Sequence, residues 1–321
     1  MRRSKKQFLY WTLLAILALF VLGELFLRWR YGLGDAVLMR ADDDYEYIAQ
    51  PNQRRKRFGN RVVYNSHSMR NEELIPGSAR ILCIGDSILN GGTLTDQSEL
   101  ATSILSKELS AETGKQVQVL NVSAGSWGPD NCLAYLKRHG HFGAKGIILV
   151  VSSHDAHDTM TFVPVVGQHR SYPSRQYPLA IMELWDRYLF PGKPFFKQSK
   201  ASVDNEFRRI HHIEKTEVTF NPGFQGILDY ARDFRLSFAI YLHATLYEMN
   251  AGNYDADGQA VIEFCKRNQI PWVQDLGNGL DRECILQNDY LHYSPKGQAL
   301  MGRLLKPRCQ TMLSHDKDLN P

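Results

Sequence analysis

The chain has 321 residues, of which 43% are hydrophobic and 22% charged, so it is long enough for one large α/β domain or two small ones with a packed core. A formal net charge of +4 is too small to predict a nucleic-acid partner. Much of the basic excess lies in two runs, Arg2–Lys6 and Arg54–Arg57. The second run is interpreted as a solvated face; contact with an anionic polysaccharide or with lipid headgroups is the alternative.

Residues 8–27, FLYWTLLAILALFVLGELFL, are apolar over the length that a helix needs to cross a bilayer, with Glu24 as the interruption. We expect an uncleaved anchor with a cytoplasmic tip over residues 1–30, because no clear signal-peptidase site follows the apolar stretch. The basic residues before this stretch outnumber those after it, which predicts a cytoplasmic N-terminus. The expected location is therefore the inner (cytoplasmic) membrane, with one span and the remaining chain in the periplasm or otherwise outside the cytoplasm.

Residues 31–79 are polar and rich in turn signals, and are expected to form a stalk and the lead-in to a domain at 80–313. Apolar runs follow at 81–84, 117–122, 146–152, 236–242 and 270–274, and amphipathic stretches separate most of them. This alternation predicts an α/β fold with a parallel sheet that is covered on both faces. Residues 314–321 are expected to be a disordered tail.

Residues 160–225 interrupt the alternating pattern with many of the chain's prolines, several aromatic residues and the basic segment EFRRIHHIEK. A segment of this length without regular structure indicates either a cap over a functional site or an irregular surface insertion. The sequence does not decide between the two.

The five cysteines, Cys83, Cys132, Cys265, Cys284 and Cys309, include no CxxC pair, which disfavours a zinc ribbon or a thioredoxin-type site. Cys83 lies in an apolar run and is expected in the core. A disulfide among Cys265, Cys284 and Cys309 is compatible with an oxidising compartment, although spacing alone does not predict it.

The apolar run ILCIG is followed directly by Asp86 and Ser87. A serine at the turn from a buried strand into a helix has its hydroxyl raised at the edge of the sheet, which favours a nucleophile. A nucleophilic serine needs a base, and the base needs an orienting acid. Asp289 and His292, in NDYLHYSPKGQ after the last predicted strand, supply both.

Gly85-Asp86-Ser87 and Asp289-x-x-His292 resemble the first and last blocks of the SGNH (GDSL) hydrolases, which are three-layer, flavodoxin-like α/β/α enzymes that cleave or transfer acyl esters. The resemblance spans about residues 60–306, and the lead-in NSHSMRNEE is similar to that of membrane-anchored bacterial members. It implies that Ser87 is the nucleophile, His292 the general base and Asp289 its orienting acid.

Two blocks depart from the family pattern. The oxyanion-hole glycine of the second block falls on Ser126, with Gly125 just before it, and a backbone N–H survives that change. The third block has His154 where the family has an asparagine whose side chain donates to the oxyanion. We therefore expect an oxyanion hole formed by Ser87, Gly125 or Ser126, and His154, because an imidazole N–H can also donate.

Two alternatives are weaker. The run HDAHD, residues 154–158, contains ligand types for zinc but lacks the helical HExxH spacing, so neither a metal site nor a cofactor site is predicted. The segment Ala124–Gly128 imitates a nucleophile elbow around Ser126, although Ser87 has the better context between strand and helix.

Further residues are candidates for the walls of the site. Asp86, Trp127 and Asp155 are possible lining residues, and packing is the alternative for Trp127. Tyr241, His243 and Tyr247 are expected either to line the cleft or to close its rim.

The sequence thus favours a serine esterase acting on acyl esters, with O-acetyl groups of a cell-surface or exported polysaccharide as the substrate that the resemblance suggests. The alternatives are an O-acyltransferase and a non-catalytic polysaccharide-binding or scaffold protein. The expected partners are an acylated carbohydrate or other ester and the membrane; protein partners and oligomeric state are not predicted.

Overall fold

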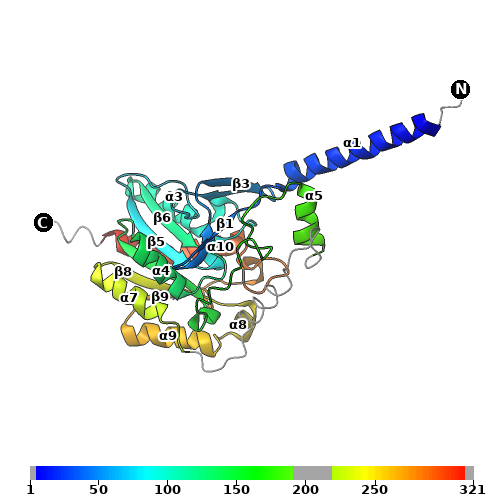
Figure 1. Ribbon diagram of the computed structural model, residues 1–321. Helices are drawn as coiled ribbons and strands as arrows, with labels where there is room; N and C mark the ends of the chain where they lie inside the picture. Colours follow the sequence, from blue (N-terminus) through cyan, green and yellow to red (C-terminus); the bar gives the residue numbers. More distant parts are fainter. Residues whose placement is uncertain (1–4, 191–218, 315–321) are drawn as a thin grey trace.

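The computed structural model describes residues 5–190 and 219–314 (Figure 1). Its strands are β1 (Met39–Asp42), β2 (Glu46–Ala49), β3 (Gln53–Arg57), β4 (Asn60–Tyr64), β5 (Ala79–Gly85), β6 (Val117–Ser123), β7 (Gly146–Ser152), β8 (Ser237–His243) and β9 (Trp272–Gln274). Its α-helices are α1 (Lys5–Tyr31), α2 (Ser87–Asn90), α3 (Ala101–Thr113), α4 (Pro129–His139), α5 (Ala180–Glu183), α7 (Gly223–Asp233), α8 (Leu246–Ala251), α9 (Ala256–Asn268) and α10 (Pro295–Ser314). Short 3₁₀ turns are η1 (Gln97–Glu99), η2 (Ser153–Ala156) and η4 (Arg282–Cys284), and η3 (Leu184–Leu189) is a π-helix.

The central sheet is parallel, with the order β6-β5-β7-β8-β9, and each of the five predicted apolar runs forms one of its strands. This is the flavodoxin-like doubly wound order, in which the chain turns from one half of the sheet to the other between the first and third strands. Here that switch point lies between β5 and β7. Ligands of such sheets bind at the carboxyl ends of the strands beside the switch point.

Two cores cover the two faces of the sheet, which confirms the expected three-layer α/β fold. One core packs the sheet against α3 and α10, through residues such as Leu105 and Leu305. The other packs it against α4, α7 and α9, through residues such as Leu136, Ile227 and Val261. Every residue of the central strand β7 is buried, because a parallel sheet with two covered faces exposes neither side of such a strand. The edge strand β6 is also buried throughout.

The expected stalk is a folded part of the domain. Within residues 31–79, β1 pairs with β2 and β3 with β4 as two antiparallel hairpins. Tyr45, Ile48 and Val62 from these hairpins are fully buried in the same core as α4. Charged and turn-forming residues separate the short apolar stretches of this segment, so its sequence resembles that of a polar linker. The interpretation as a stalk was wrong for this reason.

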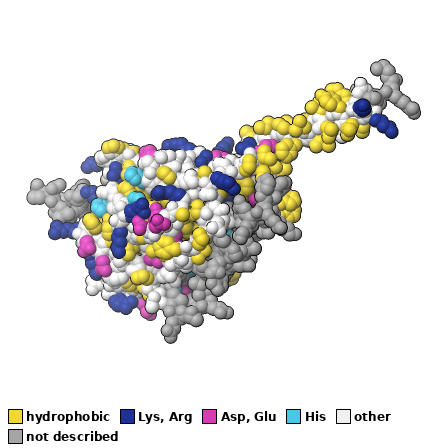
Figure 2. Space-filling view, viewed as in Figure 1, with side chains coloured by type: hydrophobic (Ala, Val, Ile, Leu, Met, Phe, Trp, Pro, Cys, Tyr) yellow, Lys and Arg dark blue, Asp and Glu magenta, His cyan; other side chains and the backbone are white. Residues whose placement is uncertain are grey.

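Helix α1 projects from the domain and carries apolar side chains along its length (Figures 1 and 2). It is long and apolar enough to cross a membrane, a test that a signal sequence also passes. Glu24, which interrupts the apolar run, accepts hydrogen bonds from the backbone N–H groups of Ala180 (2.7 Å) and Ile181 (3.1 Å) and from Arg28 Nε (2.7 Å). The acid therefore joins the base of α1 to α5.

The basic run Arg54–Arg57 is a solvated face in part: Arg54 and Lys56 are exposed, whereas Arg57 is not. Arg57 is buried, and its guanidinium lies 2.6 Å from Glu183 Oε1. Arg54 pairs with Glu72 and Arg55 with Asp35, each at 2.6 Å. Three of the four basic residues in this run are thus engaged by acids of the same chain.

Glu183→Gln is expected to lower the free energy of unfolding by about 3–5 kcal/mol, because it leaves the buried Arg57 guanidinium without its charge partner. Glu72→Gln is the matched control: Glu72 pairs with Arg54 and Arg61 at the surface, so about 1 kcal/mol or less is expected. Urea unfolding of the full-length chain in detergent measures both. Equal losses in the two variants would contradict the structural role of the buried pair.

The segment 160–225 is described in part. Residues 160–179 are irregular, α5 and η3 follow, and residues 219–222 lead into α7. The basic segment EFRRIHHIEK lies outside the described residues, as does the expected tail from residue 315. All five cysteines are described, buried and unpaired, so the disulfide considered among the last three is not formed.

Candidate active site

Ser87 begins α2 directly after β5, at the switch point of the sheet. Asp86 caps this helix by accepting the Ile88 N–H at 2.8 Å. A side chain at Gly85 would come within 2.5 Å of the Val150 carbonyl oxygen on β7, so only glycine fits there. The Gly-Asp-Ser sequence thus combines a close strand contact, a helix cap and a raised hydroxyl.

Ser87, His292 and Asp289 form a continuous chain of hydrogen bonds. Ser87 Oγ lies 3.0 Å from His292 Nε2, and His292 Nδ1 lies 2.9 Å from Asp289 Oδ2. The second oxygen of Asp289 accepts the backbone N–H groups of Leu291 (2.8 Å) and His292 (3.0 Å). One short loop before α10 therefore holds both the acid and the imidazole in register with the serine that begins α2.

The Asp289 carboxylate is stabilised in its charged form. Partial burial opposes ionisation, but the N–H groups of His292 and Leu291 and the His292 imidazole together lower the pKa of Asp289 below its usual value. A charged acid beside Nδ1 favours the tautomer whose Nε2 can accept the proton of Ser87. The geometry and the electrostatics are those of a serine nucleophile with a base and an orienting acid.

The loop of the second block is held against β2. Ser126 has a φ of +58°, a left-handed conformation that glycine adopts most easily and that agrees with glycine at this position in the SGNH pattern. The Tyr47 hydroxyl donates to the Gly125 carbonyl at 2.9 Å, and the Trp127 indole N–H donates to the Tyr47 carbonyl at 2.8 Å. Tyr47 is not among the residues predicted for the site, because nothing in the sequence of residues 31–79 indicates contact with this loop.

His154 lies on η2 at the end of β7, and its side chain is 44% exposed. Its Nδ1 is 3.0 Å from Ser152 Oγ, and its Nε2 is 3.7 Å from Asp155 Oδ1 and 4.0 Å from Asp86 Oδ2. His154 therefore faces two buried acids at the carboxyl edge of the sheet, one of them adjacent in sequence to Ser87.

Asp86 and Asp155 are both buried, and each has one carboxylate oxygen without a hydrogen-bond partner. Burial raises the pKa of each acid to about 7, and the charge of Asp155 adds to the effect on Asp86. With His154 they form the group in the described part of the chain whose ligand atoms, all within 4.8 Å of one another, could hold a metal ion.

The run HDAHD does not converge on one point. His157 Nε2 lies 3.6 Å from Asp257 Oδ1 on α9, and its Nδ1 lies 3.2 Å from the Thr219 carbonyl oxygen. His154 faces Asp86 instead. The two histidines of the run thus have different neighbours.

The three possible lining residues lie below the surface. Asp86, Trp127 and Asp155 are each 1% exposed, so none presents a surface to a substrate. Trp127 packs edge to face on Tyr45, as its alternative interpretation held. Tyr241 and His243 are fully buried rather than at a rim, whereas Tyr247 is exposed.

A recess of about 180 Å³ is lined by residues at the end of α2 and in the second-block loop, and neither Ser87 nor His292 is among its lining residues. Its lining includes three tyrosines, two arginines and the backbone of both segments: Tyr64, Tyr172, Tyr188, Arg57, Arg187, Asn90, Gly92, Ala124 and Gly125. Tyrosine faces and guanidinium groups are side chains that pack on and hydrogen-bond to polar rings.

Comparison with known proteins gives fold-level likenesses only. No protein-family model and no curated protein matches the chain. Among solved structures, a putative lipolytic protein of the G-D-S-L family from Desulfitobacterium hafniense DCB-2 is 11% identical, with a TM-score of 0.38 over 72% of this chain and 99% of that one. A catalytic mutant of an acetylxylan esterase from Geobacillus stearothermophilus is 13% identical, with a TM-score of 0.44 over 73% and 95%.

A two-domain esterase active on acetylated mannans is 11% identical, with a TM-score of 0.45 over 74% of this chain and 50% of that one. Identities and TM-scores this low do not carry an activity over to this chain. The chain's own features are more informative: the strand order, the Gly-Asp-Ser turn after β5 and the hydrogen-bonded Ser87, His292 and Asp289. In these features the chain resembles the SGNH/GDSL hydrolases.

Proposed function

We propose that the protein is a serine esterase that removes acyl groups, acetyl in particular, from a cell-surface or exported carbohydrate. The observation that carries the proposal is the chain of hydrogen bonds from Ser87 through His292 to Asp289 at the switch point of the sheet. A protein that only binds polysaccharide has no need of this arrangement, which argues against the non-catalytic alternative.

In the proposed mechanism, Ser87 Oγ attacks the ester carbonyl while its proton passes to His292 Nε2. The oxyanion is held by backbone N–H groups of Ser87 and Ser126 and by the His154 side chain. Collapse of the tetrahedral intermediate breaks the ester C–O bond, and His292 returns the proton to the leaving sugar oxygen. Water then repeats the sequence on the acyl-enzyme and releases the carboxylic acid.

The recess beside α2 and the second-block loop supports a carbohydrate substrate, because its tyrosines offer ring faces on which a sugar can pack. The apolar helix α1 supports a membrane location. In the proposed topology the N-terminus is cytoplasmic and the hydrolase-like domain is periplasmic or otherwise extracytoplasmic, which gives the site access to envelope polysaccharides.

The test is release of acetate from acetylated xylan and acetylated mannan by the full-length protein in detergent micelles, with Ser87→Ala as the blank. We expect acetate release from at least one polymer by the wild type and none by the variant. A second arm adds an unacetylated oligosaccharide: an acetylated oligosaccharide at the expense of free acetate would identify a transferase. A folded wild-type protein that neither releases nor transfers acetate would overturn the proposal.

A further inference from the structure

His243, the last residue of β8, is fully buried, and both of its ring nitrogens face acceptors. Nδ1 lies 2.5 Å from Asp275 Oδ2, and Nε2 lies 2.7 Å from the carbonyl oxygen of Leu291. A carbonyl oxygen can only accept, and so can an ionised carboxylate. The arrangement is satisfied when the imidazole carries protons on both nitrogens.

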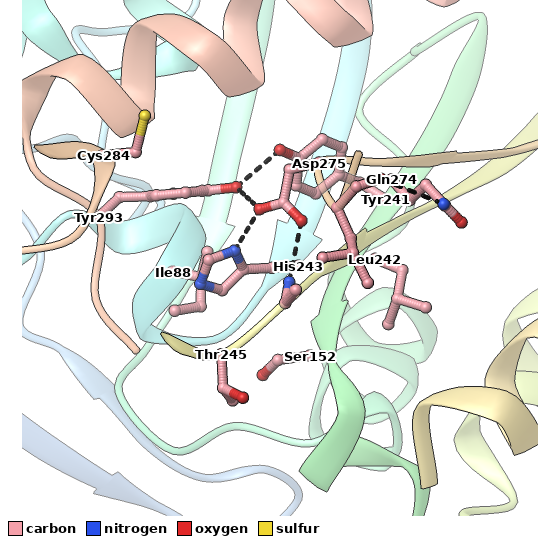
Figure 3. Close-up of polar contacts among 12 residues, drawn as sticks. Ile88, Ser152, Tyr241, Leu242, His243, Thr245, Gln274, Asp275, Cys284 and Tyr293 are labelled. Carbon is pink, nitrogen blue, oxygen red and sulfur yellow. Dashed lines mark hydrogen bonds and ion pairs between the residues drawn. The ribbon is translucent and has the colours of Figure 1, made fainter. Parts of the chain in front are cut away.

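Asp275 is the centre of this buried cluster (Figure 3). Its Oδ1 accepts the Ala244 N–H at 2.9 Å, and its Oδ2 accepts both the Tyr293 hydroxyl and His243 Nδ1. Tyr241 extends the cluster with a hydrogen bond of 2.7 Å to the Tyr293 hydroxyl. The cluster thus connects the ends of β8 and β9 with the loop before α10.

The two residues held by this cluster are the neighbours of His292 in the chain. Leu291 is held by its carbonyl oxygen and Tyr293 by its hydroxyl. His292 itself points away from the cluster, to Ser87 and Asp289. The backbone on either side of the proposed general base is therefore tied to one buried His–Asp pair that contacts neither the nucleophile nor its acid.

The charge of His243 is stabilised by its surroundings. Burial alone would lower the pKa of His243, but the adjacent Asp275 and the Leu291 carbonyl raise it above its usual value. The result is an ion pair enclosed in the core, with further hydrogen bonds on the acid. A buried ion pair is by itself weak evidence for net stability, but removal of one partner leaves an uncompensated buried charge.

We propose that His243 and Asp275 are positioning residues for the proposed esterase: a buried second His–Asp pair that holds the Leu291–Tyr293 segment so that His292 faces Ser87. The inference rests on the proposed function of His292 and deepens it. A displacement of about 1 Å at a catalytic group can cost about 100-fold in rate, so a tether behind that group affects turnover without touching substrate.

The groups around His243 and Asp275 determine which proton is lost first as the pH rises. Tyr241 and Tyr293 are buried beside it, and burial raises the pKa of both well above 10.0, as it also raises that of Tyr254. Asp86 and Asp155 act on the imidazole through space. Because the tyrosines stay neutral at moderately alkaline pH, loss of the His243 proton is the event expected to release the tether as pH rises.

The experiment compares His243→Gln with His243→Asn in the full-length protein. The amide nitrogen of glutamine corresponds to Nε2 and can donate to Leu291, whereas that of asparagine corresponds to Nδ1 and can donate only to Asp275. We expect His243→Asn to lower kcat for 4-nitrophenyl acetate by about 10- to 100-fold with KM unchanged. His243→Gln should keep most of kcat, and the loss of rate that we expect of the wild type at alkaline pH should be absent from it, since an amide does not titrate.

Hydrogen exchange of the backbone over residues 286–294 gives a readout independent of activity. Faster exchange there in His243→Asn than in His243→Gln supports the tether, and equal exchange overturns it. Equal kcat in the two variants, per folded molecule, also overturns the positioning role, because a purely structural pair would lower their thermal stability alike and leave turnover alone. An inactive wild type whose exchange still separates the variants would instead overturn the proposed function and keep the tether.

Discussion

Ser87→Ala is expected to lower kcat for 4-nitrophenyl acetate by on the order of 10⁴- to 10⁶-fold and to abolish labelling by a fluorophosphonate probe. This variant lacks the hydroxyl whose oxygen lies 3.0 Å from His292 Nε2. If Ser87 is the nucleophile, the acyl-enzyme cannot form without that hydroxyl. The full-length protein in detergent, assayed by 4-nitrophenolate release and by probe fluorescence on a gel, gives both readouts.

Ser126→Gly is the matched control for the rival nucleophile. Glycine accepts the φ of +58° at this position more easily than serine and keeps the backbone N–H proposed for the oxyanion. The control should therefore retain most of the activity and all of the labelling. Activity lost with Ser126→Gly but kept with Ser87→Ala would reverse the assignment.

The sheet could be predicted from the sequence because a parallel sheet covered on both faces requires continuous apolar runs. A run such as 146–152 has no polar face that could be exposed to water, and in the structure it forms β7 with every residue buried. The hairpins β1–β2 and β3–β4 could not be predicted in the same way. Their core residues include Tyr47 in β2 and Tyr45 in the turn before it, which are amphipathic aromatic residues that composition does not distinguish from those of a polar linker.

The residues of the site also differ in how far the sequence predicts them. Ser87, Asp289 and His292 carry a pattern of residue type and spacing that reflects their contacts, since an Asp three residues before a His can bond its imidazole within one turn. His243 and Asp275 are 32 residues apart and come together only because β8 and β9 are neighbours in the sheet. A histidine at the end of a predicted strand does not disclose whether it faces solvent or an acid on the next strand.

His154→Ala is expected to lower kcat for 4-nitrophenyl acetate by about 100- to 1000-fold, as the loss of one oxyanion donor does, whereas His154→Asn should be mild because its amide also donates. The structure indicates a second way in which His154 could affect the rate, through its charge. His154 Nε2 faces Asp155 and Asp86, so a protonated imidazole would also offset their charge beside Ser87.

The pH dependence of the two variants separates these contributions. The pKa values of Asp86 and Asp155 are raised to about 7 by burial, so both acids are largely neutral below that pH and ionise above it. His154 lowers the pKa of Asp86 through its charge, and its removal would shift that ionisation to higher pH. If His154 acts as a donor, kcat of His154→Asn exceeds that of His154→Ala both below and above pH 7. If His154 acts by its charge, the two variants are equally impaired, and the impairment is strongest at the pH where the acids ionise. Equal damage at every pH would remove His154 from the proposed oxyanion hole and leave the backbone N–H groups of Ser87 and Ser126 as its donors.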